Sequence, residues 1–349
     1  TIDGKYYRYN LECNNNYYCA DNIVIHNFEE VTFPKEKYIL FDDFVLDLVN
    51  KKFKCYDKCR YDTAEDVIKH IKTIKIENID TGKEIYIVCE DGIKIYLELN
   101  KFNQVVSVVM DGVRRINYDF MQNSFHIRRF SSKDTIIIED RVLKSSFELE
   151  YIYLPKCEII GNSFALRAEN LKTINLPNVK RVDYSFISYA KNVQSVYMPF
   201  LEVAGNNFLY YNEKLKSLCL PNLRRVGYSF MSENNSLIEC DFPNLNLVGA
   251  SFLRKNRDLS RLNAPNLFSV EDNFLANNIA LCHLYLPNLE VIGANFLYSN
   301  KIIKNIYIPN VKFIDSNFLH NNRDKINTIY MPNLLSFEGN DVRIQNKTL

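Results

Sequence analysis

The chain has 349 residues, of which 47% are hydrophobic and 24% are charged, and its formal net charge is +1. This charge balance excludes the strongly basic footprint of a nucleic-acid-binding protein and gives no attraction to an anionic membrane surface. No apolar run approaches the roughly 20 residues of a membrane-spanning helix, so we expect no membrane insertion, and the length fits two or three folding units.

The first segment, residues 1–27, ends in a pattern of two short strands around an asparagine-rich turn. It reads YNLECNNNYYCADNIVIHN up to Asn27. This stretch resembles the C-terminal end of a Hint domain, the autoprocessing fold of hedgehog proteins and inteins. The resemblance implies that the Asn27 side-chain amide attacks its own carbonyl, that His26 polarises this carbonyl or moves the proton, and that cleavage falls before Phe28. The alternative is an ordinary β-hairpin with a polar turn.

A Hint domain also needs an N-terminal nucleophile and a Thr-x-x-His segment, and neither is present here. Phe28 is not Cys, Ser or Thr, so the resemblance implies cleavage without splicing. We therefore interpret residues 1–27 as a Hint remnant that is not active in this chain. The alternative function that the resemblance implies is a payload, residues 28–349, released by cleavage at Asn27 of an upstream Hint-like domain. Because the sequence opens with Thr1 and no charged, apolar leader follows, we expect a fragment or a processed product.

Residues 28–103 predict a small α+β unit. Residues 63–66 resemble a capping box that opens a short helix with Val67, Ile68 and Ile71 on one face. Three strand patterns follow, at 74–79, 84–88 and 93–99. We expect this unit to cover the exposed edge of the first repeat. It holds no Gly-rich phosphate loop and no nucleophile motif, so we predict neither an enzyme nor a cofactor.

From Val105 almost to the C-terminus the sequence repeats at a fixed period. Nine of the ten prolines, from Pro155 to Pro332, are spaced by 22 residues seven times and finally by 23. A phenylalanine lies nine residues after each of the first eight of these prolines, and an asparagine lies thirteen residues after most of them. The two columns include Phe208, Phe230, Phe252, Phe274 and Phe296, and Asn234, Asn256, Asn278 and Asn300.

One unit reads LIECDFPNLNLVGASFLRKN, in which Leu237, Cys240 and Phe242 have the spacing of a leucine-rich-repeat strand. The sequence resembles that family, and specifically the BspA-type subclass of bacterial and protist surface proteins. The resemblance implies a mainly β solenoid of about 10–11 coils over residues 104–349, with a parallel β-sheet and a short helical or irregular convex side. It also implies a non-enzymatic scaffold that binds a macromolecule.

The spacing within one unit predicts the role of each position that recurs from unit to unit. Side chains alternate along an extended strand, so Leu237, Cys240 and Phe242 are expected to point inward. Proline then closes the strand, and a glycine six residues later is expected to allow a backbone turn. We expect the phenylalanines to stack from coil to coil and the asparagines to satisfy backbone groups of neighbouring loops.

The cysteines fall into groups with different expected environments. Cys157 and Cys240 occupy repeat positions that otherwise hold Val, Leu or Ile, so they are predicted to be core thiols. A second group is Cys13, Cys19, Cys55 and Cys59. The three-residue gap between the last two departs from a zinc knuckle, so we favour structural cysteines and predict no metal, with zinc as the alternative. Unpaired cysteines favour the cytoplasm, whereas the family resemblance favours the cell surface or secretion.

The expected binding surface is the concave sheet, where equivalent residues of neighbouring strands lie about 4.8 Å apart. Its candidate contact residues are Tyr197, Tyr285, Tyr307 and Tyr330, with His283 and Asn305 at their flank. Tyrosine is enriched in binding hot spots, which favours a protein partner, with a glycan as the alternative. The competing interpretation is that tyrosine simply suits exposed strand positions. The sequence predicts no oligomeric state.

Overall fold

The computed structural model describes residues 71–322 and 326–337, together with the backbone of eight short strands upstream of them. These strands are β1 (Lys5–Tyr7), β2 (Tyr18–Ala20), β3 (Ile23–Ile25), β4 (Glu30–Thr32), β5 (Tyr38–Leu40), β6 (Phe44–Asp47), β7 (Lys52–Cys55) and β8 (Asp66–Ile68). β1 pairs with β4, β2 with β3, and β5 to β8 form an antiparallel sheet. The chain divides into two compact units, residues 1–155 and 156–349.

The first unit is built around an antiparallel meander. Its strands are β9 (Ile71–Ile79), β10 (Gly82–Cys89), β11 (Lys94–Asn100) and β12 (Val105–Asp111). Two further strands, β14 (Arg129–Ser132) and β16 (Tyr151–Tyr153), extend the same sheet in parallel from β12. The three strand patterns predicted after residue 73 are therefore confirmed, and β12 is where antiparallel pairing gives way to the parallel pairing of the repeats.

The short helix predicted after residue 63 is wrong. The structure has β8 (Asp66–Ile68) in this region, paired with β7 so that Ile68 lies opposite Phe53, and β9 begins at Ile71. Val and Ile lose side-chain freedom in a helix and fit a pleated sheet, and strand pairing therefore overrides the capping-box pattern. Helices are absent from the described residues altogether, so none is able to span a membrane there.

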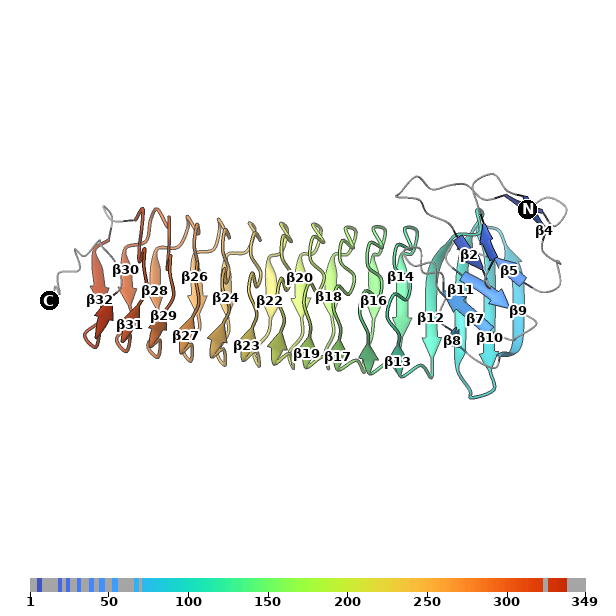
Figure 1. The fold of residues 1–349 in the computed structure, drawn as a ribbon, viewed down its shortest axis with the longest axis horizontal. Coiled ribbons are helices and arrows are strands. Elements are labelled where there is room, and N and C mark those ends of the chain that lie inside the picture. Colours follow the sequence, from blue (N-terminus) through green and yellow to red (C-terminus); the bar gives the residue numbers. More distant parts are fainter. Residues whose placement is uncertain are drawn as a thin grey trace. The chain divides into compact units, whose positions relative to one another are not determined.

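The repeats form a β-solenoid of about ten turns in which each coil contributes two short parallel strands. Figure 1 shows the coils of the second unit stacked in sequence order, from green to red. In this unit the three-residue strands are β18 (Thr173–Asn175), β20 (Ser195–Tyr197), β22 (Ser217–Cys219), β24 (Glu239–Asp241), β26 (Arg261–Asn263), β28 (His283–Tyr285), β30 (Asn305–Tyr307) and β32 (Thr328–Tyr330). We call the side of the solenoid that they form the first face.

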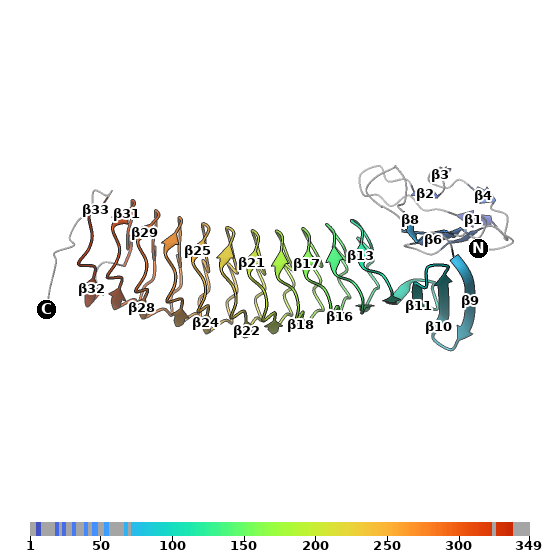
Figure 2. The same ribbon diagram turned by 90° about the horizontal axis from the view of Figure 1, so that it is seen from below.

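The second strand of each coil is only two residues long. In the second unit these strands are β17 (Ile159–Ile160), β19 (Arg181–Val182), β21 (Val203–Ala204), β23 (Arg225–Val226), β25 (Leu247–Val248), β27 (Ser269–Val270), β29 (Val291–Ile292), β31 (Phe313–Ile314) and β33 (Ser336–Phe337). They pair continuously in parallel and form the second face. Figure 2 shows the two sets of strands along opposite edges of the coils. In the first unit, β13 (Arg115–Ile116) and β15 (Ile137–Ile138) pair in the same way.

The phenylalanine column is the continuous core of the second unit. The rings of Phe208, Phe230 and Phe252 stack in succession, with centroids 5.1 and 5.5 Å apart and interplanar angles of 6° and 7°. The stack continues through Phe274 and Phe296 with centroid distances of 5.5 and 5.4 Å. All five side chains are fully buried. The stacking predicted from the nine-residue offset is present.

The buried asparagine column is a second ladder inside the coils. The backbone N–H of Asn234 donates to Asn256 Oδ1 at 2.7 Å, and the N–H of Asn256 donates to Asn278 Oδ1 at 2.6 Å. In the other direction, Asn256 Nδ2 donates to the Met231 carbonyl of the preceding coil at 2.9 Å. Each asparagine therefore bonds to both neighbouring coils, through its side-chain amide to the preceding coil and through its backbone N–H to the next, and Asn300 Nδ2 donates to the Leu275 carbonyl in the same way. This confirms that the column satisfies buried backbone groups.

The loops between the two faces are irregular, which is one of the two predicted alternatives, and their backbone alternates between left- and right-handed φ. In one coil, Ser251, Leu253 and Lys255 have φ values of +62°, +50° and +60°. Residues of alternating handedness cannot build a helix, which needs consecutive right-handed residues. This conformation lets backbone N–H groups point both ways along the solenoid. The N–H of Ser251 donates to the backbone carbonyl of Asp272 in the next coil at 2.7 Å, and the N–H of Leu253 donates to the backbone carbonyl of Phe230 in the preceding coil at 3.0 Å.

The glycines that recur six residues after a proline leave space that a Cβ would fill, as predicted, but they do not adopt the left-handed φ of a glycine turn. Left-handed φ among the described glycines occurs only at Gly82, Gly92 and Gly112, all in the first unit, so no turn requires a glycine at this repeat position. A Cβ at Gly205 or Gly293 would instead lie 2.7 Å from a carbonyl carbon of the preceding coil. The glycine is needed because two backbones approach closely.

At the same repeat position, three coils of the second unit carry an acidic residue, namely Asp183, Glu271 and Asp315, whereas Gly205, Gly227 and Gly249 follow one another in successive coils. A Cβ at Gly205 or Gly293 would meet the carbonyl carbon of an acidic residue in the preceding coil, and a Cβ at Gly249 would meet that of Gly227. The close approach therefore accompanies the glycine itself, whichever residue the preceding coil carries.

Candidate binding surfaces of the solenoid

The first face carries a stack of exposed tyrosines on its last three strands. Tyr285 and Tyr307 have ring centroids 5.0 Å apart at 18°, and Tyr307 and Tyr330 are 4.9 Å apart at 7°. Their neighbours Leu284 and Ile306 point inward and are buried, because side chains alternate along each strand. The tyrosines remain exposed at 57%, 39% and 41% of their surface. We call these three residues the tyrosine stack.

The flanking residues predicted from the sequence lie beside the stack. His283 and Asn305 are two residues before Tyr285 and Tyr307 on the same strands, and Asn305 Nδ2 lies 2.9 Å from His283 Nδ1. The amide donates and the ring nitrogen accepts when the imidazole is neutral with its proton on Nε2. The described residues therefore bring together five of the six predicted contact residues.

Tyr197 is the predicted contact residue that the structure separates from the others. It is 48% exposed on β20, with Cys219 on the next strand in place of a tyrosine. Between it and the stack, the same column holds Asp241 and Asn263, which are joined by a hydrogen bond of 2.7 Å. The upstream part of the first face is therefore polar, and the aromatic part begins at Tyr285.

The orientation of the stacked rings determines what the surface offers to a partner. Tyr307 has a neighbouring ring against both of its faces, so it presents its edge and its hydroxyl group outward. Ring edges carry the positive part of the aromatic quadrupole, and a phenol hydroxyl both donates and accepts hydrogen bonds. The stack suits hydrogen-bond acceptors and the π faces of partner side chains better than flat sugar rings, which need an open aromatic face.

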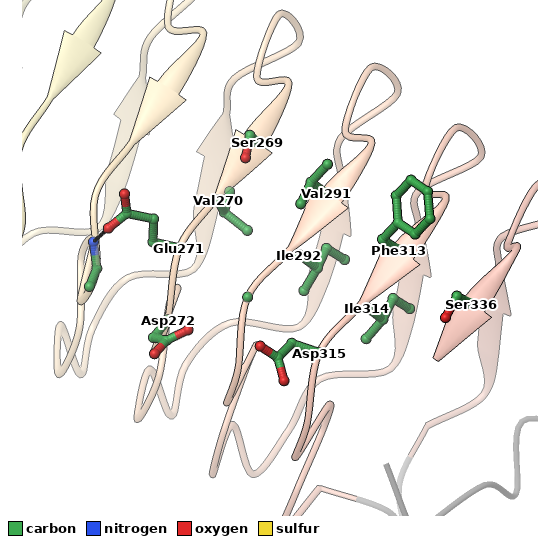
Figure 3. A pocket seen from close by; sticks show the side chains of 12 residues that line it. Ser269, Val270, Glu271, Asp272, Val291, Ile292, Phe313, Ile314, Asp315 and Ser336 are labelled. Atoms are coloured by element: carbon green, nitrogen blue, oxygen red, sulfur yellow. Dashed lines mark hydrogen bonds between the residues drawn. The ribbon is translucent and has the colours of Figure 1, made fainter. Parts of the chain in front are cut away.

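Sequence reasoning missed a shallow groove on the second face. The groove has a volume of about 580 Å³ and extends over β27, β29, β31 and β33. Figure 3 shows apolar side chains, among them Val291 and Phe313, on the strands, and the carboxylates of Glu271, Asp272 and Asp315 in the loops that follow them. The sequence signal for this face is an apolar residue four residues after some of the prolines, as at Leu247, Val291 and Phe313, whereas the leucine-rich-repeat pattern describes only the strand that ends at the proline.

A second asparagine ladder was also missed. In five coils the asparagine directly after the proline donates to the proline carbonyl of the preceding coil, for example Asn244 Nδ2 to Pro221 at 2.9 Å and Asn266 Nδ2 to Pro243 at 2.7 Å. This ladder is exposed, unlike the one through Asn256. The Pro-Asn pair that recurs in the sequence could have indicated this ladder.

The predicted core thiols are confirmed, and their chemistry follows from burial. Cys157 and Cys240 are buried, and desolvation raises the pKa of the Cys157 thiol to about 12 and raises the pKa of Cys240 as well. Cys219 and Cys282 are partly exposed. Among the described residues, no group of three His, Cys, Asp or Glu side chains could hold a metal ion.

The predicted autoprocessing residues lie outside the described residues, as do Cys13 and Cys59, and the side chains of Cys19 and Cys55 are not described either. The strands nearest to His26 and Asn27 are β2 and β3, which form an antiparallel hairpin with Tyr18 opposite Ile25. A hairpin is expected both for a Hint remnant and for an ordinary β-turn, so the Hint resemblance stays a prediction.

The stacked parallel coils, the inward repeat positions and the buried asparagine column define a leucine-rich-repeat solenoid. A family model described as BspA type Leucine rich repeat region matches the chain in six copies, over residues 100–216 and 204–327. Because these matches cover about two thirds of the chain, the protein belongs to the BspA-type leucine-rich-repeat family.

Similarity to individual proteins is weaker. An uncharacterized protein of Acanthamoeba polyphaga mimivirus is 24% identical over 147 residues, which is 40% of this chain and 36% of that protein's own length. A leucine-rich repeat protein from Bacteroides ovatus has 15% identity and a TM-score of 0.44, covering 79% of this chain and 90% of its own. A leucine rich cell surface protein from Faecalibacterium prausnitzii has 11% identity and a TM-score of 0.32, covering 78% and 96% respectively.

Proposed function

We propose that the chain is a non-enzymatic scaffold that binds a protein partner through the tyrosine stack on its first face. The observation that carries the proposal is the exposure of three consecutive stacked tyrosines, since exposed apolar or aromatic surface that the fold does not need favours an interaction site. A protein is favoured over a glycan because the inner ring faces are covered by neighbouring rings.

The test compares two triple variants on immobilised peptide and glycan arrays. In the first, Tyr285, Tyr307 and Tyr330 are replaced by alanine. In the matched control, the equally exposed Tyr184, Tyr189 and Tyr228 outside the first face are replaced by alanine. The expected result is that fluorescently labelled wild-type protein and the control bind the same peptides, and that the first variant loses them. Both variants should keep far-UV circular dichroism and a thermal transition close to wild type, because exposed side chains contribute little to folding.

Two outcomes would contradict the proposal. If the first variant binds the same peptides as wild type, the stack is not the contact surface. If wild-type protein binds glycans and no peptides, and loses them in the first variant, the surface is a glycan site and the ring-face argument is wrong.

A further inference from the structure

The second face carries a broken row of exposed apolar side chains over five successive coils, in which Ser269 and Ser336 occupy the positions in register with Val291 and Phe313. The row consists of Leu247, Val291 and Phe313 on the strands and of Phe268 and Leu335 one residue before them, and the exposed fractions of Leu247, Phe268, Val291, Phe313 and Leu335 are 39%, 46%, 37%, 49% and 73%. Single exposed apolar residues are ordinary on a protein surface, but a contiguous patch favours an interaction site. We call this row the apolar strip.

Exposed carboxylates border the strip on one side. Glu271 Oε2 accepts the N–H of Ala250 at 3.0 Å, and Asp272 Oδ1 accepts the N–H of Ala294 at 2.9 Å. Neither of these carboxylates, nor that of Asp315, forms an ion pair with any described residue. By contrast, Lys312 and Glu290 beside the strip neutralise each other at 2.6 Å. The downstream half of the second face is therefore apolar with an uncompensated negative edge.

The upstream half of the same face carries two arginines without an ion pair, next to one exposed carboxylate, Glu202, on the preceding coil. Arg224 and Arg225 are both exposed, and neither forms an ion pair with a described residue. The other cations of this half are compensated, since Lys180 pairs with Glu158 at 2.9 Å and Arg181 pairs with Asp183 at 3.0 Å. The second face thus has two halves whose charges complement each other.

We propose that a second copy of this chain packs against the second face, with the two solenoids antiparallel. A two-fold axis that runs along the strands between β25 and β27 places β23 of one copy opposite β29 of the other. Arg225 then faces the coil of Val291, whose neighbouring coils carry Glu271 and Asp315. The exposed Val203 on β21 meets Phe313 on β31 by the same operation.

Self-complementarity is what favours a second copy over an unrelated partner. A two-fold interface uses every contact twice, so one set of arginines and one set of carboxylates gives two charged contacts, and the contact of Val203 with Phe313 also occurs twice. A cationic, apolar peptide would satisfy the strip and the carboxylates but would leave Arg224 and Arg225 uncompensated. The chain itself satisfies both halves of the face.

Sedimentation velocity of the full-length chain over a range of concentrations tests the proposal. We expect a reversible dimer that weakens as ionic strength rises, because salt screens exposed charges. Arg224→Glu with Arg225→Glu should weaken the dimer by about tenfold or more, and so should Glu271→Lys with Asp315→Lys. The combination of all four substitutions should restore association, since it exchanges the charges of the two halves.

Control variants separate this effect from changes in fold or in total charge. The double substitution Lys172→Glu with Arg261→Glu lies on or beside the first face. It changes the net charge by the same amount as Arg224→Glu with Arg225→Glu, and it should leave the dimer unchanged. Phe313→Ser removes apolar contact without altering charge and should weaken the dimer. Far-UV circular dichroism should be the same for all variants.

A wild-type chain that stays monomeric at every concentration would overturn the proposal, as would a dimer that is insensitive to both charge reversals. A dimer that each reversal weakens but that the fourfold combination does not restore would overturn the antiparallel arrangement. A monomer that binds a cationic, apolar peptide at Phe313 would assign the strip to an unrelated partner instead.

Discussion

The interior and the first face of the solenoid are built by the same period but differ in what their columns do. Rings stack in both places at nearly the same spacing, 5.5 Å between Phe252 and Phe274 and 4.9 Å between Tyr307 and Tyr330. The phenylalanines are fully buried and the tyrosines are roughly half exposed. Geometry alone therefore does not separate a structural column from a candidate binding column, whereas exposure does.

Removing an interior ring should have the largest effect on stability. Phe252→Ala leaves a cavity between Phe230 and Phe274, and large-to-small changes of a buried phenylalanine cost about 3–5 kcal/mol. Urea denaturation followed by circular dichroism measures the loss. The exposed Phe313→Ala should change the free energy of unfolding by less than about 0.5 kcal/mol. Equal losses for the two variants would mean that burial does not distinguish the columns.

Breaking the buried asparagine ladder should have the next largest effect. Asn256→Ala removes the acceptor of the Asn234 N–H and the donor to the Met231 carbonyl, and leaving such buried groups unpaired costs about 1–3 kcal/mol. The matched control is Asn266→Ala in the exposed ladder, where water can replace the lost bond to Pro243. Chemical denaturation should show a clearly smaller loss for the control.

A methyl group between two close coils should cost a similar or smaller amount. In Gly249→Ala the added Cβ would lie 2.7 Å from the carbonyl carbon of Gly227, which is backbone and cannot rotate away. Overpacking of this kind costs about 1–3 kcal/mol. The control is Ala294→Ser, which makes a similarly small change at a half-buried position two coils further along the chain. A neutral effect of the glycine variant in thermal denaturation would show that the coils separate easily.

The smallest effect concerns thiol reactivity and does not require any substitution. Because burial raises the pKa of Cys157 from its ordinary value of 9.0 to about 12, its thiol is protonated and unreactive in the folded protein. Iodoacetamide with peptide mapping should label Cys219 and Cys282 in native protein, and Cys157 and Cys240 only after unfolding. The raised pKa also means that the folded state loses stability as pH rises from about 9 towards 12, since only the unfolded thiol ionises there. Rapid native labelling of Cys240 would contradict the buried assignment.

Much of the second unit could be predicted because its period is visible in single residues. Pro243 and its equivalents fix the frame, and the alternation of side chains along a strand then places Cys240 and Phe242 inside. The backbone of the loops could not be predicted in this way. Leu253 has a left-handed φ although leucine does not favour it, because hydrogen bonds to both neighbouring coils hold the conformation. These hydrogen bonds depend on how neighbouring coils pack, and no local sequence pattern reveals them.

The candidate surfaces were predictable only in part, for a related reason. The column of Tyr285, Tyr307 and Tyr330 follows directly from the period, but the separation of Tyr197 depends on what occupies the strands between. The helix predicted before residue 71 failed because pairing with β7 decides the structure there. The second face was overlooked because two-residue strands such as β29 are too short to give a recognisable alternation.

The close approach of the coils at the glycine positions has a consequence for how such a protein can grow or shrink. Deletion of residues 287–308 would remove one complete coil with Gly293 and set Asp315 directly against Glu271, so that two side chains meet where glycine now leaves room. Deletion of residues 221–242 would instead set Gly249 against Gly205 and keep glycine on both sides of the junction. Coils whose neighbours also carry glycine are therefore the ones that recombination, or an engineer, can remove singly.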